Sequence, residues 1–305
     1  MLRLGEGAGD EILMEEALNR LESMRRKLMR IFLIAFLLIG AAVLLFFMVP
    51  LFSVILLAAA VILLTAAWGS IGRKYKAAFK KEFVEEILRM YFTDLVFDPG
   101  RGLSRQVIAD TNMMSMGNRY RSDDYICGKY KGIPFEQADV CIQQVTSNGK
   151  SSSTTTYFEG RWMIFFFNKD FQWDLQVREK GFAYAKKSGG WFSGKPKMHG
   201  IQMEDMHFEE AFDVYCMNDH EAYYILTPHI MQSMIELKEQ TEGRLLLCFV
   251  GGFLHVAVNS GHNAFEPPVF RRINGEELRN GTIHDISVIT RFVDALRLDR
   301  NLFKE

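Results

Sequence analysis

Hydrophobic and charged positions divide the chain into two very different parts. Residues 31–72 contain no charged side chain, whereas charges recur throughout the rest of the sequence. As one helix these 42 residues would extend about 63 Å, roughly twice the hydrocarbon thickness of a bilayer. Pro50, near the middle, removes a helical hydrogen bond. We therefore expect a two-helix transmembrane hairpin over residues 31–72, with a turn at Pro50.

Small residues fall at matching depths in the two expected spans. If the chain turns at Pro50, residues 40–42 (Gly-Ala-Ala) lie level with the three alanines of residues 58–60. Small side chains let transmembrane helices approach closely. The alternative is that alanine is simply compatible with lipid.

Basic residues flank the apolar tract at both ends: Arg25, Arg26, Lys27 and Arg30 precede it, and Arg73, Lys74 and Lys76 follow it. Because basic residues collect on the cytoplasmic side, we expect both termini in the cytoplasm and the hairpin in the inner membrane. About thirty mostly polar residues come before the tract, which argues against a cleaved signal peptide. The lipid bilayer is the first expected partner.

Helical periodicity continues on both sides of the hairpin. Residues 1–30 carry an apolar stripe from Leu13 to Leu28, and residues 73–94 carry another from Tyr75 to Met90, so each segment should form an amphipathic helix. The two helices could pack together as a stalk. A coiled coil between two copies of the chain is the alternative, and a homo-oligomer is therefore a possible assembly.

From about residue 95 the pattern changes to short strand-like runs mixed with helical segments. We expect a hairpin around Gly132, an exposed polar loop over residues 146–156, a central strand near residues 164–167 and a second tight hairpin at Gly251–Gly252. The mixture predicts an α+β cytoplasmic domain over residues 95–305, mainly antiparallel, with packed helices. The residues near 186–203 could divide it further.

Two expected helices belong to this domain. Thr227 and Pro228 provide a cap and a first helical position for a helix that starts there, and apolar spacing predicts a final helix over residues 282–298. The segment that follows His220, with the sequence AYYIL, is typical of a strand, as is the segment around Asp213.

Composition limits the functional classes. The formal net charge of −1 gives no overall attraction to nucleic acid, so nucleic acid is not an expected partner. The four cysteines form no C-x-x-C pair and lie among apolar residues, which is typical of reduced core thiols in a reducing compartment.

Two stretches imitate catalytic motifs and fail at required residues. GGWFSGKP, residues 189–196, matches G-x-x-x-x-G-K, but Pro196 follows where a magnesium-binding hydroxyl and a helix are needed. HEAYY, which starts at His220, places Tyr224 where the zinc motif needs a second histidine. We expect no cofactor, no metal and no catalytic residue from these motifs.

Two weaker candidates remain. Asp213, His220 and Glu221 form a polar cluster in the sequence, which could contribute to an assembled active site or could simply lie in solvent. Trp191 and Phe192, flanked by lysines, could contact a partner or a membrane interface, or could fold back over the sheet.

The chain resembles the bacterial membrane proteins grouped as domain of unknown function family 3137. The resemblance depends on the hairpin with its basic exit, on DYICGKYKGIPFEQADV and FEGRWMIFFFNKDF, and most specifically on FEEAFDVYCMNDHEAYYILTPHIMQSM. It covers nearly the whole chain, and the N-terminal stripe and the KKSGGWFSGKPK insertion depart most from the shared pattern. It implies a membrane-anchored protein with a cytoplasmic domain, in some settings beside a LemA-like membrane protein, and supplies no catalytic residues.

These observations favour a noncatalytic protein-binding or scaffolding module at the inner face of the membrane. The alternatives are a membrane-tethered hydrolase, with a site assembled from distant residues around Asp213, His220 and Glu221, and a membrane-surface sensor that uses Trp191 and Phe192. The sequence does not identify the ligand.

Overall fold

The structure is a computed structural model that describes residues 8–149, 151–185 and 198–296. Trp191, Phe192 and the GGWFSGKP stretch lie outside the described residues. The chain divides into two compact units. The helical unit comprises residues 1–90 and 265–283, and the sheet unit comprises residues 91–264 and 284–305.

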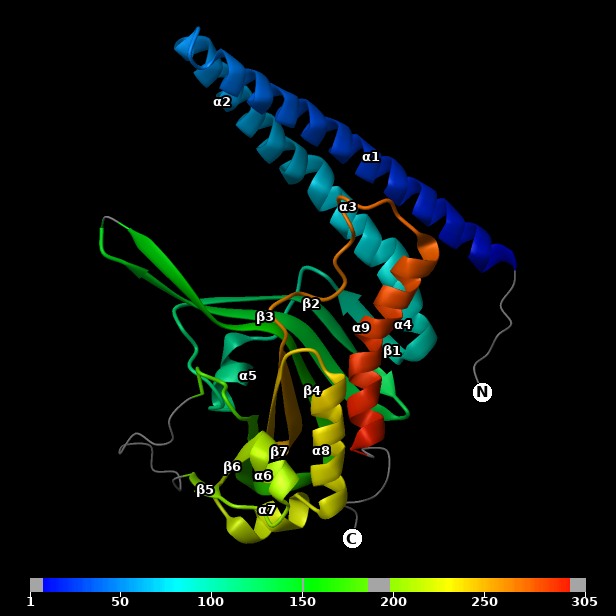
Figure 1. Cartoon of the computed structure of the whole chain (residues 1–305). Coiled ribbons are helices and arrows are strands. Elements are labelled where there is room, and N and C mark those ends of the chain that lie inside the picture. Colours follow the sequence, from blue (N-terminus) through cyan, green and yellow to red (C-terminus); the bar gives the residue numbers. More distant parts are fainter. Residues whose placement is uncertain (1–7, 150, 186–197, 297–305) are drawn as a thin grey trace. The chain divides into compact units, whose positions relative to one another are not determined.

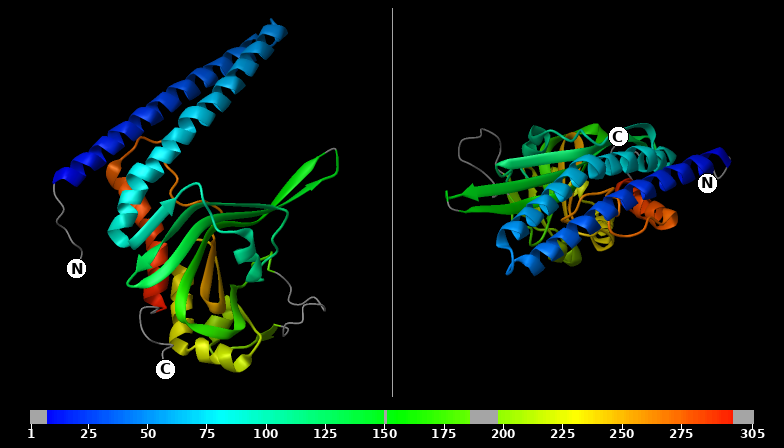
Figure 2. Two further views of the ribbon diagram at one scale, coloured as in Figure 1. Left: turned by 180° about the vertical axis from the view of Figure 1, so that it is seen from behind. Right: turned by 90° about the horizontal axis from the view of Figure 1, so that it is seen from above.

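Two long helical runs lie side by side and antiparallel in the helical unit (Figures 1 and 2). The first is α1 (Ala8–Leu45). The second is continuous from Pro50 to Tyr91 and consists of α2 (Pro50–Ala67), the π-helical turn η1 (Trp68–Gly72), α3 (Arg73–Ala78), the π-helical turn η2 (Phe79–Val84) and α4 (Glu85–Tyr91). Pro50 is the first residue of α2, where its missing amide costs no hydrogen bond. The predicted helix pair and its turn are therefore confirmed.

Small and amphipathic positions meet inside this helix pair. Ala42 and Ala60 are buried, as the matched small residues predict, whereas a Cβ added to Gly40 would meet nothing within 4 Å. Leu21 and Leu28 of the first stripe are buried, as are the aromatic residues of the second stripe. The two amphipathic stripes therefore lie at helix contacts within the chain.

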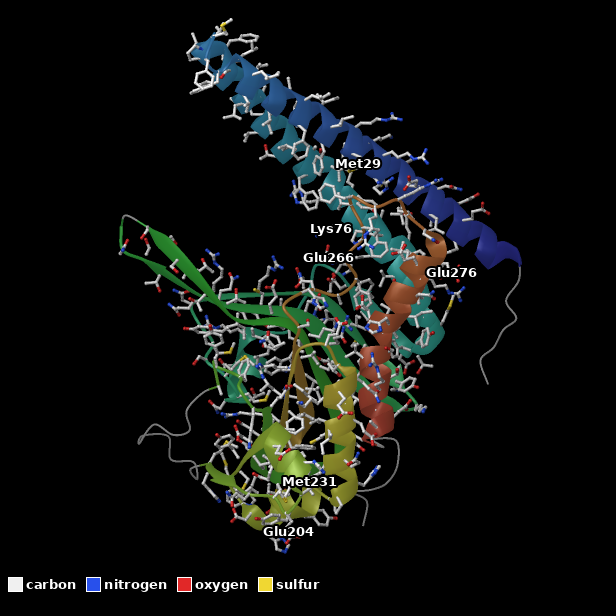
Figure 3. All side chains as sticks on the ribbon, in the orientation of Figure 1. Met29, Lys76, Glu204, Met231, Glu266 and Glu276 are labelled. Carbon is white, nitrogen blue, oxygen red and sulfur yellow. The ribbon has the colours of Figure 1, made fainter. Side chains whose placement is uncertain are left out.

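A segment from far along the chain completes the helical unit. The Tyr75 hydroxyl donates to the carbonyl of Pro268 at 2.7 Å, and Lys76 pairs with Glu266 at 2.5 Å (Figure 3). Val269 packs against a buried cluster that contains Leu28. These contacts attach residues 265–274 to the helices just beyond the charge-free tract.

Among its described residues, the sheet unit has seven strands, and all their pairings are antiparallel. The order is β1-β2-β3-β4-β6-β5, and β7 pairs with β4. The strands are β1 (Thr93–Asp98), β2 (Arg119–Tyr130), β3 (Ile133–Ser147), β4 (Ser152–Glu179), β5 (His199–Ile201), β6 (Phe212–Cys216) and β7 (Arg244–Asn259). The α+β fold with an antiparallel sheet is confirmed, and β4 is its central strand.

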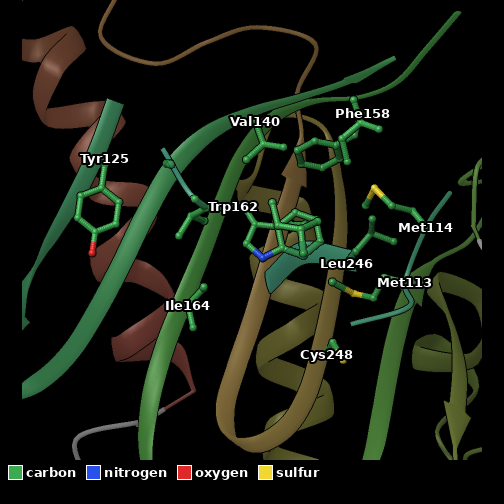
Figure 4. Close-up of a cluster of buried hydrophobic side chains, with 14 residues drawn as sticks. Met113, Met114, Tyr125, Val140, Phe158, Trp162, Ile164, Leu246 and Cys248 are labelled. Carbon is green, nitrogen blue, oxygen red and sulfur yellow. The ribbon is translucent and has the colours of Figure 1, made fainter. Parts of the chain in front are cut away.

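One face of the sheet carries a large apolar core (Figure 4). Trp162 and Phe158 of β4 lie at its centre, with ring centroids 5.7 Å apart. Residues before and after α5 (Arg105–Asp110) cover the two rings, and Met113 and Met114 are among these covering residues. Side chains alternate along a strand, so Arg161 and Asp139 face the opposite side, where the C-terminal half of α9 (Gly275–Ala295) lies.

The remaining helices are α6 (Met206–Ala211), α7 (Asp219–Ile225) and α8 (Pro228–Gln240). α8 begins at Pro228 as predicted, and the hydroxyl of Thr227 accepts a hydrogen bond from the amide of Ile230. α9 starts at Gly275, earlier than the predicted residue 282.

After residue 205, the strand expected at AYYIL is wrong, and the strand expected around Asp213 is confirmed only from Phe212 to Cys216. AYYIL belongs to α7, because the side chain of Asn218 caps the helix by accepting from the amide of Glu221. The residues before Phe212 form α6, which Asp205 caps in the same way. Glu209 therefore lies on a helix and Asp213 on a strand, and the two do not share a strand face.

The predicted hairpin at Gly251–Gly252 is also wrong, because β7 is one strand that follows β4 along its length. Gly251 has a φ of +55° at an irregularity in this pairing. Leu246 and Cys248 face the apolar core before it, and Ala257 faces the same core after it, so the alternation shifts by one residue. The glycine accommodates a bend where the sequence suggests a reversal.

The polar stretch 146–156 is mostly strand rather than loop. β3 continues to Ser147 and β4 starts at Ser152, with Ser147 opposite Ser152. The hairpin around Gly132, between β2 and β3, is present as predicted. All four cysteines are free.

Candidate functional site

The helices α1 and α2 carry an apolar band on their outer surface. Large apolar side chains from Leu33 to Leu63 are exposed, with Phe47 at 90% and Leu44 at 81%. Exposed apolar patches of this extent mark an interaction surface, because water solvates them poorly. The helical runs Met14–Leu45 and Pro50–Tyr91 are long and apolar enough to cross a membrane.

Basic residues bracket this band. Arg26, Lys27, Arg30, Arg73 and Lys74 are exposed. Arg25 is buried, and both Arg25 and Arg26 donate to the carboxylate of Glu22. Lys76 pairs with Glu266 and also lies 5.5 Å from the ring centre of Trp68. The flank is thus partly neutralised and partly open to a negatively charged partner.

A polar β-arm, defined here as residues 145–149 and 151–154, projects from the sheet unit (Figures 1 and 2). Asn118 braces its base through hydrogen bonds to the amide and carbonyl of Val145, at 2.8 and 2.7 Å. Beyond this brace, no described strand pairs with the outer edges of the β-arm. Its exposed hydroxyl residues are Thr146, Ser147, Ser151, Ser152, Ser153 and Thr154. Open edges of this kind are ready templates for strand addition.

The three polar residues singled out in the sequence have separate environments. Asp213 is half exposed on β6, with its carboxylate 3.9 Å from Lys180. His220 is exposed in the first turn of α7. Glu221 accepts the backbone amides of Gln172 and Trp173 at 3.1 Å each. Glu221 therefore ties α7 to β4, and the described contacts of the three residues do not converge on one site.

A cluster that the sequence does not reveal lies close by. The pairing of β5 with β6 places His199 opposite Cys216, and α7 begins at Asp219. His199 Nε2 lies 2.5 Å from Asp219 Oδ1, and the Cys216 thiol donates to the same oxygen at 3.5 Å. Burial and the carboxylate raise the pKa of Cys216 to about 12. The thiol therefore stays protonated and is a poor nucleophile.

A second hidden cluster is deeply buried. Asp139 and Asp124 are 1% exposed, and their carboxylates lie near that of Asp123. Burial raises the pKa of Asp139 to about 7, while Arg161 and the amide of Ala264 act in the opposite direction. One carboxylate oxygen of Asp139 accepts that amide at 2.7 Å, and the other has no hydrogen-bond partner among the described residues.

Arg161 also borders a small polar cavity of about 70 Å³. Its guanidinium donates to the carboxylate and the backbone carbonyl of Asp285 on α9. The cavity is also lined by His262, His284 and Arg291, among other polar residues. A liquid water occupies about 30 Å³, so this volume admits a few waters and excludes an ordinary organic substrate.

Sequence reasoning missed these clusters because their members are far apart in the chain. Strand register brings His199 opposite Cys216 and Asp139 opposite Asp123 of β2. The sequence did contain a signal for α7, because Asn218 followed by Asp219 and Glu221 is a pattern typical of the start of a helix.

The fold and these sites define a class of protein: an antiparallel α+β unit joined to a helical pair that could span a membrane. The family described as "Protein of unknown function (DUF3137)" matches residues 156–298, and this match supports membership of that family. The matched region contains two of the three motifs on which the resemblance depends. Comparison with curated proteins gives no match.

A solved structure has a low similarity to the chain. It is the crystal structure of the mycobacterial trehalose monomycolate transport factor A, TtfA, with 10% sequence identity and a TM-score of 0.38. The alignment covers 73% of this chain and 95% of that chain.

Proposed function

We propose that this chain is an inner-membrane protein with both ends in the cytoplasm, whose sheet unit is a noncatalytic module that binds another protein. The apolar band between basic flanks supports the anchoring. The observation that carries the binding is the β-arm, because its main-chain edges are open and its side chains are exposed. A two-stranded ribbon without a covered face is marginally stable alone.

The partner that fits the β-arm is a protein segment in extended conformation. Such a segment would add a strand to one edge, so that backbone hydrogen bonds give affinity while the hydroxyl side chains select the partner. A LemA-like membrane protein is the candidate that the family resemblance suggests. A second copy of this chain is the competing occupant.

The noncatalytic part of the proposal is supported by the state of the polar clusters. Glu221 is committed to backbone amides, Arg161 is committed to Asp285, and the Cys216 thiol is held protonated. The polar cavity beside Arg161 is too small for an ordinary substrate.

Site-specific cross-linking in intact membranes tests the binding. A photoreactive residue at Thr154 of the full chain should give an adduct with another protein, and one at exposed Glu236 on α8 should not. An adduct with a second copy would assign the β-arm to self-association. Equal adducts at both positions, or none at Thr154, would contradict the proposal.

A shortened arm provides the matched loss-of-binding variant. Replacing residues 146–153 with Asn-Gly closes the strands after the Val145–Thr154 pair with a favoured two-residue turn. This variant should remain in the membrane and lose the partner in affinity purification. A reporter fused to residue 305 tests the orientation separately, since an external carboxyl terminus would overturn it.

A further inference from the structure

An apolar groove lies in the helical unit at one end of the charge-free tract. Its volume is about 590 Å³, and its lining residues are Phe32, Leu64, Thr65, Trp68, Gly69 and Arg73. This size is within the range of sites that hold small ligands. Five of the six lining residues lie in the uncharged tract, and Arg73 is the first charged residue after it.

The position of the groove along the helices determines what can reach it. Phe32 is the second residue of the tract and Trp68 is close to its other end, so both ends of the hairpin meet here. Tryptophan and basic residues concentrate where hydrocarbon gives way to headgroups. If the hairpin spans the bilayer, the groove opens at this boundary.

The π-helical turn η1 shapes one wall of the groove. A Cβ added to Gly72 would come within 2.9 Å of the Trp68 ring, so the glycine allows the indole to lie flat against the helix. Lys76 lies 5.5 Å from the centre of the same ring. Isolated π-helical turns occur frequently at functional sites.

Arg73 forms the polar lip of the groove. Its Nε donates to the carbonyl of Gly69, and a Cβ added to Gly69 would lie 3.5 Å from Nη2 of Arg73. The guanidinium is therefore held along the glycine, at the point where the apolar lining ends. A fixed guanidinium can bind a phosphate through two parallel hydrogen bonds.

The distant segment of the helical unit adds an aromatic and basic edge beside the groove. Phe270 is 71% exposed, and its ring centre lies 6.0 Å from that of Phe32. Arg271 follows, with its side chain 84% exposed. The contacts of Tyr75 and Lys76 with this segment hold it in place. An exposed aromatic residue followed by a cation fits a headgroup layer better than water.

We propose that this groove binds one anionic phospholipid of the surrounding bilayer, with an acyl chain against Phe32, Leu64 and Trp68 and the phosphate at Arg73. The occupant follows from charge complementarity and position: the floor is apolar, the lip is cationic and both lie at the membrane boundary. The inference rests on the anchoring part of the proposed function. It concerns a site separate from the β-arm.

The groove is tested by the lipid that stays bound to the full chain. The chain is purified from membranes and then titrated with phosphatidylglycerol or phosphatidylcholine. Native mass spectrometry should show one phosphatidylglycerol that survives exchange with phosphatidylcholine. Arg73→Gln should weaken its retention about tenfold or more, as expected for a lost charged hydrogen bond. Lys74→Gln, which removes a neighbouring exposed charge outside the groove, should retain it.

A second pair of variants tests the wall without changing any charge. Gly72→Ala should displace the Trp68 ring and reduce retention, whereas Gly40→Ala should have no effect because its Cβ meets nothing within 4 Å. Equal retention of the two lipids, or equal effects of Arg73→Gln and Lys74→Gln, would overturn the site. Alkaline extraction separates the two proposals. If alkali extracts the wild-type chain from membranes, the proposed membrane anchoring is refuted. If the chain stays inserted but shows no preference between the two lipids, only the lipid-binding groove is refuted.

Discussion

The helical unit and the sheet unit place their apolar side chains in opposite ways. In the sheet unit, Trp162 and Phe158 are fully buried, and apolar residues cover both faces of the strands. In the helical unit, Leu44 and Phe47 point outward while alanines fill the helix contact. The hydrophobic effect explains the first arrangement in water, and the second is the arrangement that a pair of membrane-spanning helices would need.

Polar groups show the same contrast. The sheet unit contains buried charges such as Arg161 and Asp139, each held by specific neighbours. The charge-free tract contains none, as the proposed membrane insertion requires, since an unpaired charge in hydrocarbon is costly. The comparison predicts that equivalent substitutions will have different consequences in the two units.

Truncation of Trp162 should have the largest effect. Trp162→Ala leaves a cavity in the core of the sheet unit and should lower its free energy of unfolding by about 3–5 kcal/mol. Hydrogen exchange of β3 and β4, measured on the full chain in detergent, reports this loss. Phe47→Ala, at a residue that is 90% exposed, should leave the exchange unchanged; equal effects would contradict the contrast between the units.

The buried carboxylate of Asp139 should make stability depend on pH. Its pKa rises from about 3.9 in the unfolded chain to about 7 in the fold. The folded state therefore holds the extra proton between pH 4 and 7, and the free energy of unfolding falls as pH rises through that window. Asp139→Asn should remove this decline and stabilise the chain at pH 8 by up to about 4 kcal/mol.

Denaturation at several pH values checks this prediction. The quantity to compare is the difference in the free energy of unfolding between Asp139→Asn and the wild type. The difference cancels the opposite contribution of His255, whose pKa burial lowers to about 4. If this difference in the free energy of unfolding stayed constant between pH 4 and 8, the raised pKa of Asp139 would be refuted.

A charge in the helix contact should have the next largest effect. Ala60 is fully buried near the middle of α2, so Ala60→Arg should oppose insertion by about 2.5–3.5 kcal/mol. The fraction that resists alkaline extraction measures insertion. Ser70→Arg adds the same charge at the basic end, where it should be tolerated, and equal losses would argue against a membrane-spanning α2.

The smallest effect is expected at the tie between α7 and β4. Glu221→Ala leaves two backbone amides without their acceptor and should cost about 1–2 kcal/mol. Asp213→Ala removes only a half-exposed pair with Lys180 and should change stability by about 0.5 kcal/mol or less. Thermal unfolding of both variants checks this prediction. A larger loss of stability in Glu221→Ala than in Asp213→Ala supports a structural role for Glu221, and equal losses contradict it.

Local patterns predicted much of the fold. Charge-free length and Pro50 predicted the helix pair, and Thr227 with Pro228 predicted the start of α8. Prediction was wrong where local signals competed. Gly251 suggests a turn but accommodates a bulge, and AYYIL has strand-forming residues but follows the strong helix cap of Asn218.

The candidate sites were less predictable than the fold. The basic flanks were visible because a flank is a property of neighbouring residues. The β-arm was expected as a loop, since a polar stretch of low complexity lacks the apolar alternation that indicates a strand, and its backbone pairing is known only from the fold. The distant edge of the lipid groove, at Phe270, could not be found at all, because the contact with Phe32 spans more than two hundred residues.

The sequence by itself determined which parts of the chain avoid water, because hydrophobicity and charge belong to individual residues and their near neighbours. It determined the helix pair, the antiparallel α+β class and the family. Only the tertiary structure decided which distant polar groups meet, as at Asp139 and at His199, since strand register and helix packing bring them together. The raised pKa of Asp139 follows from burial, which no local stretch of sequence specifies.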